Sequence, residues 1–118
     1  MTYDNNNIFA KIIRGELPAD KVYEDEAVLA FHDAYPVAPL HVLVIPKGKY
    51  TSFDDFSLSD AEVVKDFFLK VRHVAHLLGV NDSGYRLVTN HGEDAMQTVK
   101  HYHVYILAKK RAKNHQCQ

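Results

Sequence analysis

One stretch near the end of the chain decides the fold: Gln97-Thr98-Val99-Lys100-His101-Tyr102-His103-Val104-Tyr105-Ile106-Leu107. β-Branched, aromatic and aliphatic residues dominate it, and such residues favour a β-strand. Because the side chains of a strand alternate between its two faces, His101, His103 and Tyr105 are expected to share one face. The residues between them would point to the other face.

A second histidine opens another strongly predicted strand, His41-Val42-Leu43-Val44-Ile45-Pro46. A single histidine at the start of a strand is more often structural than catalytic. If the two strands are neighbours, however, His41 lies close to His101, His103 and Tyr105. The sequence would then bring three imidazoles and one phenol together.

The overall composition is that of a globular protein. The chain has 118 residues, of which 47% are hydrophobic and 25% charged, so residues 1–118 are predicted to form one domain. Residues 108–118 are expected to be a flexible polar and basic tail. The single cysteine, Cys117, excludes an intramolecular disulfide framework and suits the reducing cytoplasm.

Charge and hydropathy argue against two classes of partner. The formal net charge is −1, which implies no bulk attraction to nucleic acid or to a membrane surface. No apolar run reaches the length of a membrane span, and no secretory leader is recognisable. We therefore expect neither nucleic acid nor membrane as a partner.

Helical and strand patterns complete the predicted architecture. Four further elements are expected: a short helix over Ile8–Arg14, a hairpin of Lys21–Glu24 with Val28–Asp33, a long helix that follows the capping-box sequence Ser59-Asp60-Ala61-Glu62 and stops at Gly79, and a strand over Tyr85–Thr89. Together they predict an α+β domain with a mostly antiparallel sheet.

The histidine pattern resembles that of the histidine-triad (HIT) nucleotide hydrolases, and most closely the Hint-type purine nucleoside phosphoramidases. The similarity includes the preceding Gln97-Thr98-Val99 and a second signature over residues 38–47, and it extends from Ile8 to Leu107. It implies a five-stranded sheet with one short and one long helix. It also implies a homodimer that joins two sheets across the long helix and an edge strand.

The resemblance assigns the catalytic side chains. His103 would attack the phosphorus of a nucleoside phosphoramidate and form a nucleotidyl-histidine intermediate, which water then hydrolyses. A backbone carbonyl would fix its tautomer, while His41 and His101 would stabilise charge and relay protons. Tyr105 stands where the family has its third histidine. No metal and no cofactor is implied.

The resemblance also assigns the nucleotide-binding side chains. In the family an aspartate at the position of Asp33 binds the ribose hydroxyls, as a carboxylate can accept two hydrogen bonds from a diol. Polar groups of the last loop would hold the phosphate oxygens: Asn90, Gln97 and Thr98. Apolar side chains would wall the base pocket: Ile8, Phe9, Ile12, Phe31 and Leu43.

Three departures from the family pattern fall around the phosphate end. Besides Tyr105, the pairs Ala95-Met96 and Ala108-Lys109 replace pairs of small residues. We expect Met96 to add bulk where glycine allows the backbone to approach phosphate. The prediction is therefore a purine nucleotide-binding hydrolase with weakened turnover.

Two alternatives remain open. The first is a nucleotide-binding protein that has lost turnover, because the base and ribose end keeps the family's residue types. The second, weaker one is a metal-binding protein, because a His-x-His pair with a third histidine nearby also occurs in metal sites. His73 and His76, one helical turn apart, have a metal-ligand spacing too, but a solvated helix face is the expected explanation.

Overall fold

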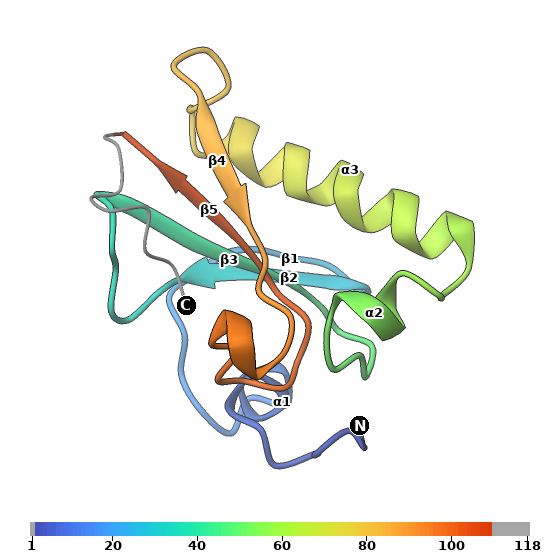
Figure 1. Cartoon of the computed structure of the whole chain (residues 1–118). Coiled ribbons are helices and arrows are strands. Elements are labelled where there is room, and N and C mark those ends of the chain that lie inside the picture. The colour runs from blue at the N-terminus through green and yellow to red at the C-terminus, as the bar shows by residue number, and fades with distance from the viewer. Residues whose placement is uncertain (1, 110–118) are drawn as a thin grey trace.

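The fold is a five-stranded antiparallel sheet with helices on both faces (Figure 1), as seen in a computed structural model that describes residues 2–109. The strands are ordered β1-β2-β3-β5-β4. Their bounds are β1 Lys21–Glu24, β2 Val28–His32, β3 Leu40–Pro46, β4 Tyr85–Val88 and β5 Val104–Ala108. The helices are α1 Ile8–Ile13, α2 Phe53–Phe56, α3 Ala61–Leu77 and the 3₁₀ turn η1 Glu93–Ala95.

This architecture confirms the predicted fold class and the number of strands in the sheet. All neighbouring strands pair antiparallel. β5 continues to Ala108, which is buried, so the tail expected from residue 108 does not begin there. Residues 110–118 lie outside the described part of the chain. Within residues 2–109, no helix combines the length and apolar character that a membrane span needs.

Alternation along the strands builds two cores, one on each face of the sheet. Figure 1 shows α3 lying along one side of the sheet, while α1 and the N-terminus lie away from it. The α3 side buries Phe67, Val71 and Val74 against the even-numbered residues of β3 and β5, including Val44 and Ile106. The α1 side buries the odd-numbered residues of the same strands together with α1. One face of the sheet is thus filled by α3, which leaves the other face for a site.

The predicted strand over residues 97–107 is only half right. β5 begins at Val104, and the preceding residues are irregular because their backbone groups bond outside the sheet ladder. The Tyr102 amide donates to the Tyr50 carbonyl, and the Thr89 hydroxyl donates to the His103 carbonyl. The alternation still persists, since Tyr102 packs in the α3-side core and His103 contacts Phe9 of α1.

Helix capping also differs from the prediction. The N-cap of α3 is Asp60, without a side-chain cap, and the Ser59 hydroxyl donates instead to the Phe56 carbonyl. That carbonyl belongs to α2, a short helix that the sequence patterns did not reveal. The Asp55 carboxylate organises its start by accepting from the amides of Thr51 and Ser52, both at 2.8 Å. Ser59 is therefore used to end α2 rather than to begin α3.

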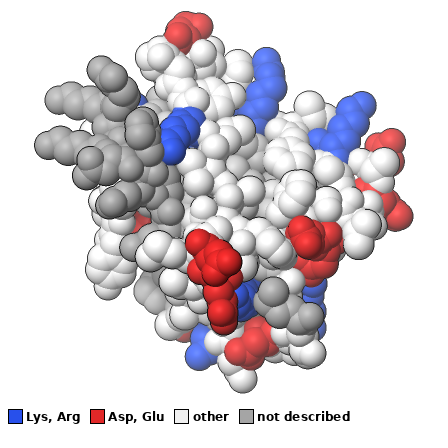
Figure 2. Space-filling view, in the orientation of Figure 1, with Lys and Arg blue, Asp and Glu red and all other residues white. Residues whose placement is uncertain are grey.

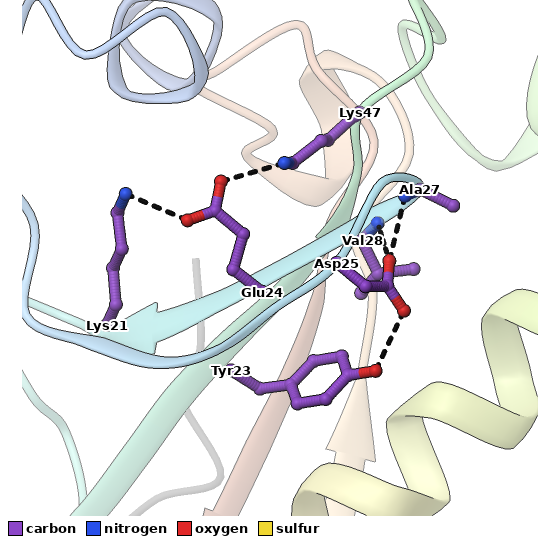
Figure 3. A network of polar contacts seen from close by, with 7 residues as sticks. All are labelled: Lys21, Tyr23, Glu24, Asp25, Ala27, Val28 and Lys47. Carbon is purple, nitrogen blue, oxygen red and sulfur yellow. Dashed lines mark hydrogen bonds and ion pairs between the residues drawn. The ribbon is translucent and has the colours of Figure 1, made fainter.

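The β1–β2 turn is tied down by a polar network (Figure 3). One Asp25 oxygen accepts from the amides of Ala27 and Val28, and the other accepts from the Tyr23 hydroxyl and the Lys70 ammonium. Burial alone would raise the pKa of Asp25, but these donors hold it well below its usual range. The turn predicted at this aspartate is thereby linked to α3.

The surface carries charges of both signs. Figure 2 shows Lys and Arg as well as Asp and Glu on the visible face, with some groups of opposite charge next to each other near its lower end. This mixture agrees with the net charge of −1.

Candidate functional site

A pocket of about 620 Å³ opens on the α1 side of the sheet. This volume is in the range of small-molecule sites, which span about 300–1,000 Å³. Nine of the predicted site residues line it: Ile8, Phe9, Ile12, Phe31, Asp33, His41, Leu43, Thr98 and Tyr105. The structure thus brings together residues from α1, β2, β3, β5 and the loop before β5.

The pocket also has lining residues that the sequence did not single out. Most belong to the segment before β1 and the loop between β2 and β3: Pro18, Ala19, Asp20, His32, Ala34, Tyr35, Val37 and Val99. Tyr35 is almost fully exposed at this loop. An aromatic residue next to a proline gave no sequence signal beyond that of an ordinary loop.

α1 is held where its apolar side chains can form one wall. Asn7 is the N-cap of this helix, and its side chain accepts a hydrogen bond from the Ala10 amide at 2.9 Å. The Phe9 ring contacts the rings of Phe31 and His103 edge-on, at centroid distances of 5.7 and 5.0 Å. The N-cap therefore places an aromatic wall directly against a predicted catalytic histidine.

Pairing of β3 with β5 confirms the predicted neighbourhood of the two histidine-bearing strands. His41 pairs with Leu107, and Leu43 pairs with Tyr105. The buried Tyr105 ring lies between two imidazoles, at centroid distances of 4.8 Å from His41 and 5.2 Å from His103. The phenol therefore stands in the centre of the cluster rather than at its edge.

His103 has the hydrogen bonding of a neutral imidazole with one defined tautomer. Its Nδ1–H donates to the His101 carbonyl at 2.6 Å, so Nε2 keeps its lone pair. Burial lowers the pKa of His103, although the His101 carbonyl opposes this shift. The side chain is only 3% exposed and lies directly behind the pocket residues Phe9 and Tyr105.

His101 is a fully buried histidine with both ring nitrogens in use. Its Nε2–H donates to the Pro46 carbonyl at 2.7 Å, and its Nδ1 accepts from the Tyr3 hydroxyl at 2.6 Å. Burial lowers its pKa to about 4, although the bond to Pro46 opposes the shift. His101 does not line the pocket, and its ring is already committed to two protein partners.

The buried histidines should make the protein acid-sensitive. His101 has a folded pKa of about 4 against about 6.5 in an unfolded chain. Between these values the unfolded state binds more protons, so stability is full above about pH 6.5 and falls as the pH drops towards 4. We expect His101 to contribute a loss of about 3 kcal/mol across this window, measured by urea unfolding.

Two variants assign the acid sensitivity. His101→Gln should flatten the pH dependence, because its side chain does not titrate, whereas His76→Ala, on the exposed surface of α3, should leave it unchanged. A free energy of unfolding that stays constant from pH 7 to 4.5 would contradict the expectation. His41 and His103 add to the loss, because burial lowers the pKa of both.

His41 and Asp33 both line the pocket, and their side chains face each other. The Val37 amide donates to His41 Nδ1 at 3.1 Å, which assigns the proton to Nε2. That atom lies 3.3 Å from Asp33 Oδ2, within ion-pair distance but without the alignment of a hydrogen bond. Burial lowers the pKa of His41, and the Asp33 charge opposes the shift. The other Asp33 oxygen accepts from the Tyr35 amide at 2.8 Å.

The loop before β5 uses its predicted glutamine for its own folding. The buried Gln97 amide nitrogen donates to the carbonyls of Thr51 and Val99 at 2.7 and 3.0 Å, and its oxygen accepts from the Gly92 amide at 2.9 Å. Both N–H groups are therefore engaged with backbone. Asn90 does not line the pocket, whereas Thr98 does.

The two substituted pairs share a backbone property. Met96 and Lys109 have φ angles of 62° and 81° and are the non-glycine residues with positive φ in residues 2–109. Met96 is 63% exposed and does not line the pocket, so the added bulk expected at the phosphate site is not observed. Glycine adopts positive φ without strain, so it would be favoured at both positions. Met96 and Lys109 adopt the same backbone conformation at a cost in conformational energy.

The described residues contain no group of three or more His, Cys, Asp and Glu side chains placed to hold a metal ion. His73 packs its ring on Tyr23 at a centroid distance of 5.2 Å. In the His-x-His pair, both ring nitrogens of His101 are bonded to protein groups, so neither is free to bind a metal ion. In the structure His73 contributes a ring contact and His101 contributes two hydrogen bonds.

Comparisons with known proteins agree on one family. The HIT domain model matches residues 14–112. An uncharacterised HIT-like protein of Azospirillum brasilense is 50% identical over 93% of this chain and 91% of its own length. Among solved structures, a HIT family hydrolase from Clostridium thermocellum has a TM-score of 0.84 and 42% identity, covering 91% of this chain and 93% of that one. A hypothetical histidine triad nucleotide-binding protein from Sulfolobus tokodaii has a TM-score of 0.74 and 38% identity, covering 85% and 66%. This chain therefore belongs to the HIT domain family.

Proposed function

We propose that this protein binds purine nucleoside monophosphates and hydrolyses their phosphoramidates or related conjugates through a nucleotidyl intermediate on His103. The observation that carries the proposal is the bond from His103 Nδ1 to the His101 carbonyl. It leaves Nε2 as the nucleophilic atom of a neutral imidazole, directly behind a mostly apolar pocket whose lining includes the carboxylates of Asp20 and Asp33. The family membership and the hydrolase and nucleotide-binding names among its structural relatives support this assignment.

The pocket suggests how a nucleotide is oriented. The purine would lie among the apolar side chains of α1 and β2, including Phe9 and Phe31, which line the pocket. The ribose hydroxyls would donate to Asp33, whose side chain is 19% exposed. The phosphate would then approach Thr98 and Tyr105, which line the same pocket. Because the Tyr105 ring contacts that of His103 at a centroid distance of 5.2 Å, this order would bring phosphorus towards the proposed nucleophile.

The proposed chemistry has two displacement steps. His103 Nε2 attacks phosphorus, the bond from phosphorus to the amine breaks, and the amine leaves with a proton from solvent. Water then attacks the same phosphorus and loses a proton to solvent, the bond to Nε2 breaks, and the nucleoside monophosphate is released with the neutral imidazole restored. His41 Nε2–H and the Tyr105 hydroxyl are the proposed donors to the phosphate oxygens.

Two predicted site residues are proposed to act indirectly. The Gln97 side-chain amide bonds to backbone groups, and the two His101 ring nitrogens bond to the Pro46 carbonyl and the Tyr3 hydroxyl. We infer that His101 positions the nucleophile rather than relaying protons, and that Gln97 shapes the loop rather than binding phosphate. Direct contact with phosphate is left to groups that line the pocket.

The central experiment separates an enzyme from a binding protein. Product release from an adenosine phosphoramidate is measured beside calorimetric binding of adenosine monophosphate. Turnover with transient labelling of the protein by the nucleotide supports the proposed enzyme. Tight binding without turnover favours the alternative of a nucleotide-binding protein, and absence of both contradicts the proposal.

Asp33→Ala should weaken adenosine monophosphate binding by about 10- to 100-fold, because hydrogen bonds to a charged group contribute about 1.5–3 kcal/mol. Calorimetry with adenosine and 2′-deoxyadenosine monophosphates gives a sharper measurement. The parent should prefer the ribonucleotide, and the variant should not distinguish the two. Asp20→Ala, which removes another carboxylate that lines the pocket, is the matched control. Equal discrimination by the parent and Asp33→Ala would remove Asp33 from ribose binding.

We propose that the protein is a homodimer formed through α3 and the edge strand β4. Large apolar side chains are exposed on both elements: Val63, Phe68, Leu69 and Leu77 on α3 and Leu87 on β4. An edge strand with an apolar surface favours a partner that covers it. Light scattering at micromolar concentration should give twice the mass of one chain, and Leu69→Glu should reduce it to one. A parent with the mass of a single chain would contradict the proposal.

A further inference from the structure

The segment before α1 reaches the histidine cluster from a distant part of the sequence. The Tyr3 hydroxyl lies 2.6 Å from His101 Nδ1 across a separation of 98 residues. The two rings also meet edge-on, with centroids 5.6 Å apart at 66°. Tyr3 does not line the pocket, so any contribution to the chemistry must pass through His101.

The direction of this hydrogen bond follows from the opposite side of the His101 ring. The Pro46 carbonyl can only accept, so His101 Nε2 carries the proton. In the neutral ring Nδ1 is then an acceptor, and the Tyr3 hydroxyl is the donor. Burial keeps His101 neutral near pH 7 by lowering its pKa to about 4, so this pattern persists under ordinary conditions.

The same residue holds the nucleophile through its backbone. The His101 carbonyl accepts from His103 Nδ1–H at 2.6 Å. The chain of contacts therefore runs from the Tyr3 hydroxyl to the His101 ring, and from the His101 carbonyl to the His103 ring. Removing the Tyr3 hydroxyl would leave the buried His101 Nδ1 without a donor, which favours movement of the His101 ring.

We propose that Tyr3 is a positioning residue for the His103 nucleophile, acting through the His101 ring that it holds in one orientation and one tautomer. The inference deepens the proposed function and rests on it. Tyr3 and Pro46 anchor the His101 side chain from its two nitrogens, and a fixed side chain restrains the carbonyl that orients His103. Phe9 completes the arrangement by packing against both imidazoles, at 6.3 Å from His101 and 5.0 Å from His103.

Tyr3→Phe tests the proposal because it keeps the ring contact and removes only the hydroxyl. We expect kcat for an adenosine phosphoramidate to fall about five- to tenfold, with KM within twofold, since Tyr3 touches no substrate. The ¹⁵N resonance of His101 Nδ1 should shift towards that of an acceptor without a donor, and the His103 ring signals should change with it. Tyr85→Phe is the matched control, because Tyr85 packs on the α3-side core, and it should leave kcat and both histidine signals unchanged.

The two measurements separate failure of this inference from failure of the proposed function. An unchanged kcat in Tyr3→Phe, in a parent that turns over, would overturn the positioning role. A parent without turnover would contradict the proposed function. The ¹⁵N spectra would then still decide whether Tyr3 positions His103. In that case a shift of both the His101 and His103 signals supports positioning through His101, and unchanged signals overturn it.

Discussion

His103→Ala is expected to abolish phosphoramidate turnover, with a loss of at least about 10³-fold, the scale on which removal of a covalent nucleophile acts. The physical reason is the tautomer of this residue. Its Nδ1–H is bound by the His101 carbonyl, so Nε2 is an unprotonated nucleophile near pH 7. His41, which lines the pocket, does not offer such a nucleophile, because its nitrogens are a hydrogen-bond acceptor and an N–H facing Asp33.

Three measurements make the His103 test specific. Reactions are quenched rapidly without acid, because acid would hydrolyse the phosphorus–nitrogen bond. Mass spectrometry should then find a nucleotidyl adduct on the parent and none on His103→Ala. Calorimetry should find adenosine monophosphate binding preserved within a few-fold, because His103 lies behind the pocket wall rather than in it. His76→Ala, at an exposed site on α3, should keep full turnover. Hydrolysis by His103→Ala at the parental rate would show that the nucleophile is another group.

Tyr105→His is expected to raise turnover by about 10²- to 10³-fold, by analogy with restoring one transition-state donor. A tyrosine has an unperturbed pKa of about 10 and stays neutral at pH 7, whereas an imidazole can carry positive charge. The structure adds a steric reason. The Tyr105 ring contacts both His41 and His103 and lines the pocket, whereas His103 is 3% exposed and does not line it.

Tyr105→Phe separates the hydroxyl from the bulk of the ring. If ring size alone limits turnover, Tyr105→Phe should behave like the parent while Tyr105→His is faster. If the hydroxyl donates to phosphate, Tyr105→Phe should be slower than the parent. Equal turnover of Tyr105→His and an already fast parent would show that tyrosine is a tolerated substitute, and the expectation of weakened turnover would then be wrong.

Buried neutral histidines connect activity with stability in this protein. The hydrogen bonds that keep His101 and His103 in single tautomers require both rings to be uncharged. Burial shifts protonation of both rings to lower pH, and protonation there would remove the nucleophilic lone pair of His103 and the acceptor at His101. Acid conditions are expected to reduce stability through the same groups that the proposed chemistry uses.

Local sequence patterns determined the strands and the two longer helices of the fold. Period-two alternation around His103 and within Leu40–Pro46 was enough to divide the two strands into a core face and a site face, and the structure confirms that division. Alternation is a property of the extended backbone, so it survives even where residues 101–103 leave the sheet ladder. The pocket residues Phe9, Phe31 and Asp33 were predicted from the resemblance to the HIT family, and the structure brings all three to one pocket.

Only the tertiary structure decided what the individual polar groups do. Two hydrogen bonds have no local sequence signature: the one from the Tyr3 hydroxyl to His101 and the one from the Gln97 amide to the Thr51 carbonyl. Each joins residues that are far apart in sequence. Likewise, the positive φ of Met96 depends on how its loop closes onto the sheet. Buried polar groups must find partners wherever folding places them, and that requirement, unlike strand alternation, is met through space rather than along the chain.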